Sequence, residues 1–127
     1  YISVQQSLLA LDRIYNILNR KSFEEESEEG KLKLDSIKNN IEFKNVHFSY
    51  DRKREILKGI SLTIPAGKKI ALVGNSGGGK TTVCSLIPRL YNVTKGSILI
   101  DGKNIKDYSW SSLRSQIAVV FQNNIIF

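Results

Sequence analysis

Residues 74 to 82 read GNSGGGKTT and combine four glycines, one lysine and two threonines. The segment matches the pattern G-x-x-x-x-G-K-S/T, which begins here at Gly74 and ends at Thr81. Glycines let consecutive backbone N–H groups turn toward a single anion without side-chain clashes. Lys80 would supply a mobile positive charge for the outer phosphates, and the Thr81 hydroxyl would bind a magnesium ion. The segment is therefore predicted to wrap a polyphosphate.

The segments on either side of this loop have the pattern that the motif requires. Residues 70–73 are apolar and β-prone, and they predict a buried strand. Apolar residues at i, i+3, i+4 and i+7 spacing then predict an amphipathic helix: Val83, Leu86, Ile87 and Leu90. A chance glycine turn before Lys-Thr is the alternative. A dinucleotide-binding loop fits poorly, because Lys80 and Thr81 have no role in one and no acidic residue follows at the expected strand end.

Length and composition suit one ordinary globular domain, since the chain has 127 residues. It begins at Tyr1, contains no methionine and ends without a polar tail, so we expect a fragment of a longer protein. No apolar run approaches the ~20 residues of a membrane-spanning helix, and the first residues lack the pattern of a secretory signal. The single Cys84 cannot form an internal disulfide and is expected to be a small core residue.

The net charge of +7 is unevenly distributed. Residues 1–39 hold six Lys and Arg against seven Asp and Glu, whereas residues 40–127 hold thirteen against five. Such an excess suits nucleic acid, anionic lipid or a phosphorylated small molecule. Apart from the run at 52–54, the basic residues are dispersed and no aromatic residues are interleaved with them. We therefore expect no nucleic-acid partner; the run at 52–54 is either a solvated loop or a means of attracting the polyphosphate ligand.

The first 39 residues differ in pattern from the rest. Residues 1–20 are predicted to form a helix, because apolar residues alternate steps of four and three: Val4, Leu8, Leu11, Tyr15 and Leu18. Residues 21–39 contain the acidic run EEESEEG and are predicted to form a solvated linker. Residues 40–127 make up the predicted domain.

From residue 40 onward, alternating apolar and polar residues predict strands. The apolar face changes register between Phe43 and Val46, so a β-bulge is expected there. Further expected elements are a strand at 60–64, a turn at 65–67, a strand at 98–100 with a hairpin turn at Asp101-Gly102, a short helix at 110–114 and a buried strand at 117–121. The mixture of half-exposed and buried strands indicates an antiparallel layer joined to an α/β core.

Residues 40–127, which include IEFKNVHFSY at one end and QIAVVFQNNIIF at the other, resemble the nucleotide-binding domain of ATP-binding-cassette (ABC) transporters of the exporter type. The resemblance implies an α/β P-loop NTPase core with an antiparallel β-subdomain, incomplete in this chain and preceded by an N-terminal helix. That helix and the acidic linker resemble the cytoplasmic end of the last membrane helix of an exporter whose membrane and ATPase parts share one chain. Such a protein lies at the cytoplasmic face of the cell membrane.

The same resemblance implies the roles of individual residues. Tyr50, which closes VHFSY, matches the aromatic residue that stacks on adenine, although an ordinary strand-end tyrosine is the alternative. Gln122 matches the glutamine that approaches magnesium and the attacking water, although any loop could begin there. Nucleotide binding is thus expected of Tyr50, Gly74, Asn75, Ser76, Gly77, Gly78, Gly79, Lys80, Thr81 and Thr82. Lys80 and Gln122 are expected to be catalytic, and Thr81 and Gln122 to bind magnesium.

ATP and Mg²⁺ are the implied cofactors, and the implied partners are the protein's own transmembrane domain and a second nucleotide-binding domain, identical or different. This sequence lacks the family's signature motif, its Walker B aspartate with the neighbouring glutamate base, and its switch histidine. A soluble ABC-type ATPase of DNA repair or translation and an ATP-binding module that does not hydrolyse remain alternatives. His47 is expected to face solvent, and Trp110 to serve in packing.

Overall fold

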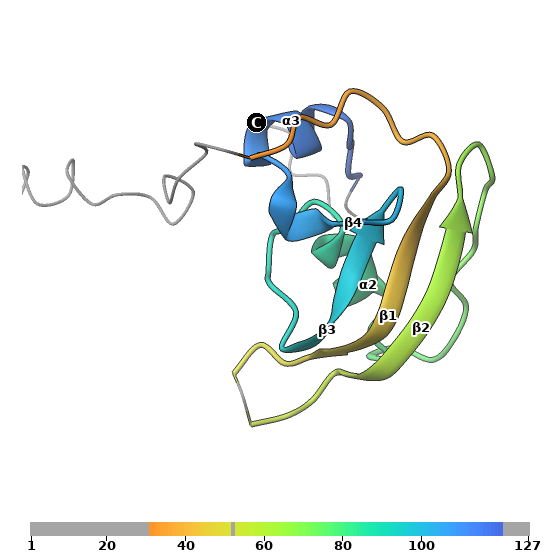
Figure 1. Ribbon diagram of the computed structural model, residues 1–127. Coiled ribbons are helices and arrows are strands. Elements are labelled where there is room, and N and C mark those ends of the chain that lie inside the picture. Colours follow the sequence, from red (N-terminus) through yellow and green to blue (C-terminus); the bar gives the residue numbers. More distant parts are fainter. Residues whose placement is uncertain (1–30, 52, 121–127) are drawn as a thin grey trace, which may run out of the picture. The chain divides into compact units, whose positions relative to one another are not determined.

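The computed structural model describes residues 31–51 and 53–120 (Figure 1). Its elements, in chain order, are β1 (Asn40–Phe48), β2 (Leu57–Pro65), α2 (Lys80–Leu86), β3 (Lys95–Ile100), β4 (Lys103–Asn104), the 3₁₀ helix η1 (Ile105–Asp107) and α3 (Trp110–Ser115). The predicted helix at 1–20, residues 21–30 of the predicted linker, and Gln122 lie outside the described residues.

The strands form one antiparallel sheet in the order β2-β1-β3-β4. The expected bulge in β1 is confirmed, because the pairing with both neighbours changes register after Phe43 or Lys44, and Asn45 has a φ of 46°. The expected hairpin is also confirmed. Asp101 and Gly102 have φ values of 50° and 81°, the left-handed pair that a tight two-residue hairpin requires.

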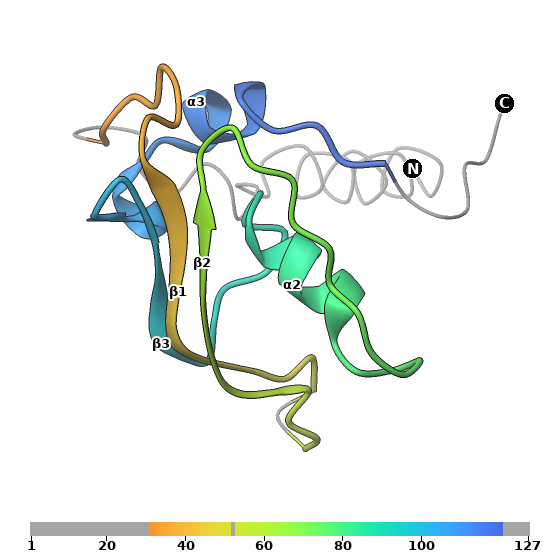
Figure 2. The same cartoon turned by 90° about the vertical axis from the view of Figure 1, so that its right-hand side faces the viewer.

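The core lies between the sheet and the two helices, and Figure 2 shows α2 against one face of the sheet. The alternation of β1 places its apolar side chains on that face, and the apolar stripe of α2 meets them. The buried apolar residues are Leu34, Ile41, Phe43, Val46, Phe48, Leu57, Val83, Leu86, Ile98, Ile100, Ile105, Tyr108 and Leu113. The antiparallel layer predicted from the sequence is therefore present with its own core.

Residues 31–39, which were expected to belong to the linker, pack against this domain. The Leu32 N–H donates to the Asp107 carbonyl at 2.8 Å, and the Ser109 N–H donates to the Leu32 carbonyl at 2.8 Å. Leu34 is buried and its N–H donates to the Ser112 hydroxyl at 3.0 Å. The acidic run ends before this stretch, and its two leucines give it apolar surface to bury.

Two predicted buried strands are absent. Residues 70–73 and 117–120 are not strands, and both carry exposed apolar side chains; Val73 is 90% exposed and Val120 is 85% exposed. The prediction assumed strands that are covered on both faces, as in a parallel sheet whose faces are covered by helices. No strand among residues 31–51 and 53–120 pairs with either segment, so neither has a ladder to join. The α/β core of the predicted fold is therefore only partly present.

Asp101 joins the β3–β4 hairpin to the start of β1. Its carboxylate accepts hydrogen bonds from the backbone N–H groups of Lys38, Asn39 and Asn40 at 2.8, 2.7 and 3.1 Å. The bond from Lys38 makes the largest contribution to lowering the pKa of Asp101 below its ordinary value. The turn that sets the register of β3 and β4 thus also fixes the entry of the chain into β1.

We expect Asp101→Ala to lower the free energy of unfolding at pH 7 by about 1–2 kcal/mol, because three N–H groups lose a charged acceptor. A carboxylate whose pKa is lowered by folding stabilises the fold above the pKa of the unfolded chain, about 4. That contribution is lost as the pH falls through the lower folded-state pKa. The difference between wild type and variant should therefore shrink below about pH 4, and urea unfolding at several pH values measures it.

Asp107→Ala is the matched control, because the Asp107 carboxylate is exposed and accepts no hydrogen bond from the described residues. Equal losses in the two variants, or a difference that does not depend on pH, would contradict the role given to Asp101.

Candidate functional site

The glycine-rich loop connects the segment after β2 to the first turn of α2. Gly79 is the N-cap of α2 and has a left-handed backbone, with φ 82° and ψ 7°. Within the loop, the Gly78 N–H donates to the Asn75 carbonyl at 3.1 Å, which closes a turn. Residues 74–78 are exposed. The predicted strand before the loop is missing. The loop itself is curved and is followed by a helix, as predicted, but this helix ends at Leu86, and Leu90 of the predicted apolar stripe is exposed.

The backbone amides of this loop are largely available to a ligand. Of residues 74–79, only Gly78 donates its backbone N–H to an acceptor within the described residues, 31–51 and 53–120. That acceptor belongs to the loop itself. Exposed amides that converge in a turn bind anions, because each N–H directs a partial positive charge outward. The loop therefore has the donors that a phosphate group requires.

Lys80 adds a full positive charge to the loop. Its ammonium group donates to the carbonyls of Gly74 and Asn75, at 2.8 and 2.7 Å. Both acceptors belong to the first residues of the motif, so the side chain folds back across the loop instead of extending into solvent. The lysine that the motif places after the glycines is thus held over the same backbone that presents the amides.

The position of the loop depends on a close approach between Gly79 and β2. A Cβ atom on Gly79 would lie 2.6 Å from the Leu57 Cδ2 atom, and Leu57 is fully buried at the start of β2. Only glycine combines this approach with a positive φ. The sheet therefore sets where α2 begins.

The two threonines after Lys80 lie in different surroundings. Thr81 is exposed and is therefore accessible to a metal ion, whereas Thr82 is buried. The Thr82 hydroxyl lies 3.1 Å from the Tyr50 hydroxyl. The structure thus brings the two predicted binding elements, the glycine loop and Tyr50, to the same end of α2.

Tyr50 belongs to a cluster of three aromatic rings. Its ring meets Phe48 edge-on at 4.8 Å between centroids and Tyr91 edge-on at 5.0 Å, and Phe48 lies 5.7 Å from Tyr91. Sequence analysis did not single out Tyr91. No spacing rule links it to Tyr50, because the two residues come from opposite ends of the β2–α2 segment.

The loop after Tyr50 is ordered by its first residue. The Asp51 carboxylate accepts hydrogen bonds from the N–H groups of Arg54 and Lys53, at 3.1 and 3.0 Å, and these bonds lower the pKa of Asp51.

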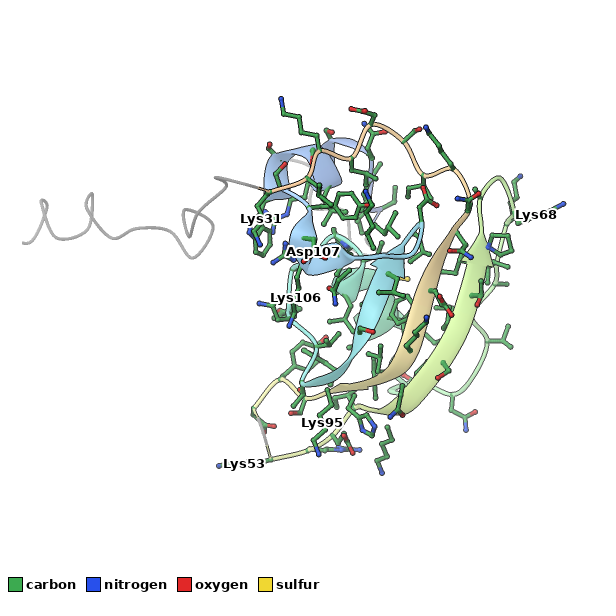
Figure 3. All side chains as sticks on the ribbon, in the orientation of Figure 1. Lys31, Lys53, Lys68, Lys95, Lys106 and Asp107 are labelled. Atoms are coloured by element: carbon green, nitrogen blue, oxygen red, sulfur yellow. The ribbon has the colours of Figure 1, made fainter. Side chains whose placement is uncertain are left out.

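Figure 3 shows labelled lysines on several sides of the molecule, with Lys53 and Lys95 at one end and Lys68 at another. The basic residues that the structure describes are therefore spread over its surface.

An open, mostly apolar hollow of about 760 Å³ lies beside the loop. Its lining includes Leu72 and Val120 from the two segments that do not form strands, and Lys80 and Thr81 from α2. Cys84 also lines it and is exposed, so the prediction of a core cysteine is wrong. The face of α2 that carries Cys84 would be buried only if strands covered the hollow.

Two other residues considered in the sequence have partners. His47 is partly buried, and its Nδ1 atom lies 2.7 Å from a Glu55 carboxylate oxygen, so it does not simply face solvent. The guanidinium groups of Arg89 and Arg114 both lie over the Trp110 ring, at 4.1 and 4.6 Å from its centroid, in agreement with a packing role. The described residues contain no cluster of His, Cys, Asp and Glu that could hold a metal, and none of their helices is long and apolar enough to span a membrane.

Comparison with known proteins places the chain in a family. The family model described as ABC transporter matches residues 57–127, which begin at β2 and include the glycine loop. The chain belongs to the ABC transporter family. The resemblance to the ABC transporter family is thereby confirmed.

Individual relatives match almost the whole chain. It is 42% identical over 126 residues to the putative multidrug export ATP-binding/permease protein YgaD of Bacillus subtilis, covering 98% of this chain and 22% of that protein. It is 44% identical over 124 residues to the ATP-dependent lipid A-core flippase of Photorhabdus laumondii, covering 97% of this chain and 21% of the flippase. The chain thus spans about a fifth of the length of these relatives.

The fold is similar to that of a solved exporter. The structure of a bacterial Atm1-family ABC exporter with ATP bound matches with a TM-score of 0.85 at 34% identity, covering 100% of this chain and 22% of that one. Together with the relatives above, this match confirms the resemblance to the ATP-binding domain of exporter-type ABC transporters.

We expect Gly79→Ala to lower the free energy of unfolding more than Gly102→Ala does. Both glycines have nearly the same positive φ, 82° and 81°, so each alanine carries a backbone cost of about 1–2 kcal/mol. A Cβ at Gly102 meets nothing within 4 Å, whereas one at Gly79 meets Leu57. Overpacking should cost Gly79→Ala about 1 kcal/mol more in urea unfolding. Equal losses would show that the approach of Gly79 to β2 does not constrain the loop.

Proposed function

We propose that this chain is the ATP-binding part of an ABC exporter that couples ATP binding and hydrolysis to transport across a membrane. The observation that carries the proposal is the curved loop at 74–79, which is exposed at 74–78, keeps most of its amides available and has Lys80 lying across it. This donor set suits a triphosphate, because amides and an ammonium group together meet several negatively charged oxygens.

Different residues of the chain would bind different parts of the nucleotide. Residues 74–79 and Lys80 would hold the phosphates, with Lys80 exchanging its two carbonyl partners for phosphate oxygens. Thr81 would bind the magnesium ion, and Tyr50 would stack on the base. Thr82 contributes to the site through Tyr50, since its hydroxyl lies against the tyrosine hydroxyl. Magnesium, when bound, would neutralise charge on the outer phosphates.

For Gln122, which lies outside the described residues, we propose the role that the family resemblance implies: it would approach magnesium and the attacking water, and with Lys80 it would act in catalysis. Phosphoryl transfer depends on placed water and balanced charge rather than on covalent steps by the protein. The chain's contribution to the reaction would therefore be positioning and electrostatic stabilisation.

The relatives favour an exporter over a soluble ABC-type ATPase. The two relatives named above, which match across almost the whole chain, are a putative export ATP-binding/permease protein and a flippase. By analogy, the working partners would be a transmembrane domain and a second nucleotide-binding domain, and the site would lie at the cytoplasmic face of the membrane. The transported substrate would be chosen by the membrane part.

Lys80→Ala should weaken binding of Mg-ATP about 10- to 100-fold, because a charge-assisted contact to phosphate contributes about 1.5–3 kcal/mol. Isothermal titration or fluorescence titration with Mg-ATP measures this loss. Lys103→Ala removes the same charge from an exposed lysine of β4 and serves as the control. Equal weakening by the two variants would mean that net charge, rather than the loop, binds the nucleotide, and would overturn the assigned site.

We expect the 127 residues by themselves to hydrolyse ATP negligibly. Their sequence lacks the Walker B aspartate, the adjacent glutamate base and the signature motif that the family uses, so the water and the second magnesium ligand are not provided. Phosphate release from Mg-ATP should therefore stay near the uncatalysed background. Steady turnover that Lys80→Ala abolishes would contradict this expectation.

A further inference from the structure

Tyr50 contacts three side chains, and two of them are distant from it in the sequence. Phe48 precedes Tyr50 by two residues, whereas Thr82 lies on α2 and Tyr91 lies after that helix. The rings of Phe48 and Tyr91 each make an interplanar angle close to a right angle with Tyr50, 87° and 88°. Such edge-to-face contacts favour one ring orientation over others.

The Tyr50 ring remains partly exposed to solvent despite these contacts. Tyr50 is 53% exposed and Tyr91 is 47% exposed, so the contacts between them leave part of each ring accessible. A tyrosine that merely filled the core would be covered, as Tyr108 is. Tyr50 is instead oriented by its neighbours while remaining open to a ligand.

The position of Tyr91 is itself fixed by the end of α2. Arg89 has a φ of 53°, and the Arg89 and Leu90 N–H groups donate back to the carbonyls of Leu86 and Ser85 at 3.1 and 3.2 Å. The buried Arg89 guanidinium donates to the carbonyls of Ile105 and Tyr108 at 3.4 and 3.3 Å, which anchors the turn to η1. The chain therefore reverses sharply after α2 and returns Tyr91 to Tyr50.

We propose that Tyr91 and Thr82 are positioning residues, which hold the Tyr50 ring in the orientation that stacks on a purine base. This inference rests on the proposed function of ATP binding and extends it to residues that the glycine-loop motif does not contain or explain. Thr82 follows Lys80 and Thr81 on α2, so its hydrogen bond couples the base platform to the element that carries the phosphate ligands. Base and triphosphate would thus be recognised at a fixed separation.

These contacts predict that a substitution of Tyr91 weakens binding of the base and leaves binding of the phosphates unchanged. Tyr91 meets Tyr50 through its ring, and its hydroxyl makes no recorded hydrogen bond among the described residues. Tyr91→Leu should therefore loosen the Tyr50 ring, whereas Tyr91→Phe keeps the ring contact. A defect that was merely structural would weaken base and phosphate binding together.

The test titrates the full chain with Mg-ATP and, in parallel, with magnesium tripolyphosphate, which has no base. The preference for ATP is the ratio of the two dissociation constants. Tyr91→Leu should reduce this preference about 2- to 10-fold, the range expected from the loss of one aromatic pair, with tripolyphosphate affinity unchanged. Tyr91→Phe should restore the wild-type preference, and Thr82→Val, which removes the hydroxyl at similar volume, should reduce it.

Leu90→Ala is the matched control, since Leu90 is the neighbouring residue and is 45% exposed. Thermal unfolding confirms that each variant is folded at the titration temperature. An unchanged preference in Tyr91→Leu, or an equal loss of affinity for ATP and tripolyphosphate, overturns the inference while leaving the proposed function intact. If the wild type binds neither ligand, the proposed function fails and this inference fails with it.

Discussion

The contact between Gly79 and Leu57 is the constraint on which the site depends. It brings the last glycine of the loop so close to the first residue of β2 that a Cβ atom would force the Leu57 side chain to shift. Because Leu57 is buried in the core, such a shift would disturb the packing of the sheet. The exposed amides and Lys80 are therefore carried on a rigid support, as a site that must match the shape of its ligand requires.

The antiparallel sheet gives the second binding element its place. The bulge in β1 shifts the alternation of side chains, and the strand ends at Phe48, just before Tyr50. Helix α2 then connects the two elements, because it begins at Lys80 and presents the Thr82 hydroxyl to Tyr50. One short helix thus links the residues assigned to the phosphates with the residue assigned to the base.

An apolar hollow lies where part of the expected fold is missing, although the sequence pattern for that part is strong. Residues 70–73 and 117–120 have the composition of buried parallel strands, but a strand also requires neighbours for its N–H and C=O groups. None of the described strands supplies them, so both segments border the hollow with exposed side chains. In the antiparallel layer every strand has a partner, because β1 pairs with both β2 and β3, and β3 also pairs with β4.

The sequence by itself determined the glycine loop, the bulge, the Asp101-Gly102 hairpin and the short helix at 110–114, because each depends on local backbone preferences or on spacing within a few residues. Through a family resemblance it also predicted a base-stacking role for Tyr50, without showing what surrounds that residue. Only the tertiary structure decided that Tyr91 and Thr82 meet Tyr50, that 31–39 pack on the domain and that Cys84 is exposed. These outcomes depend on contacts between distant segments, which no periodicity along the chain encodes.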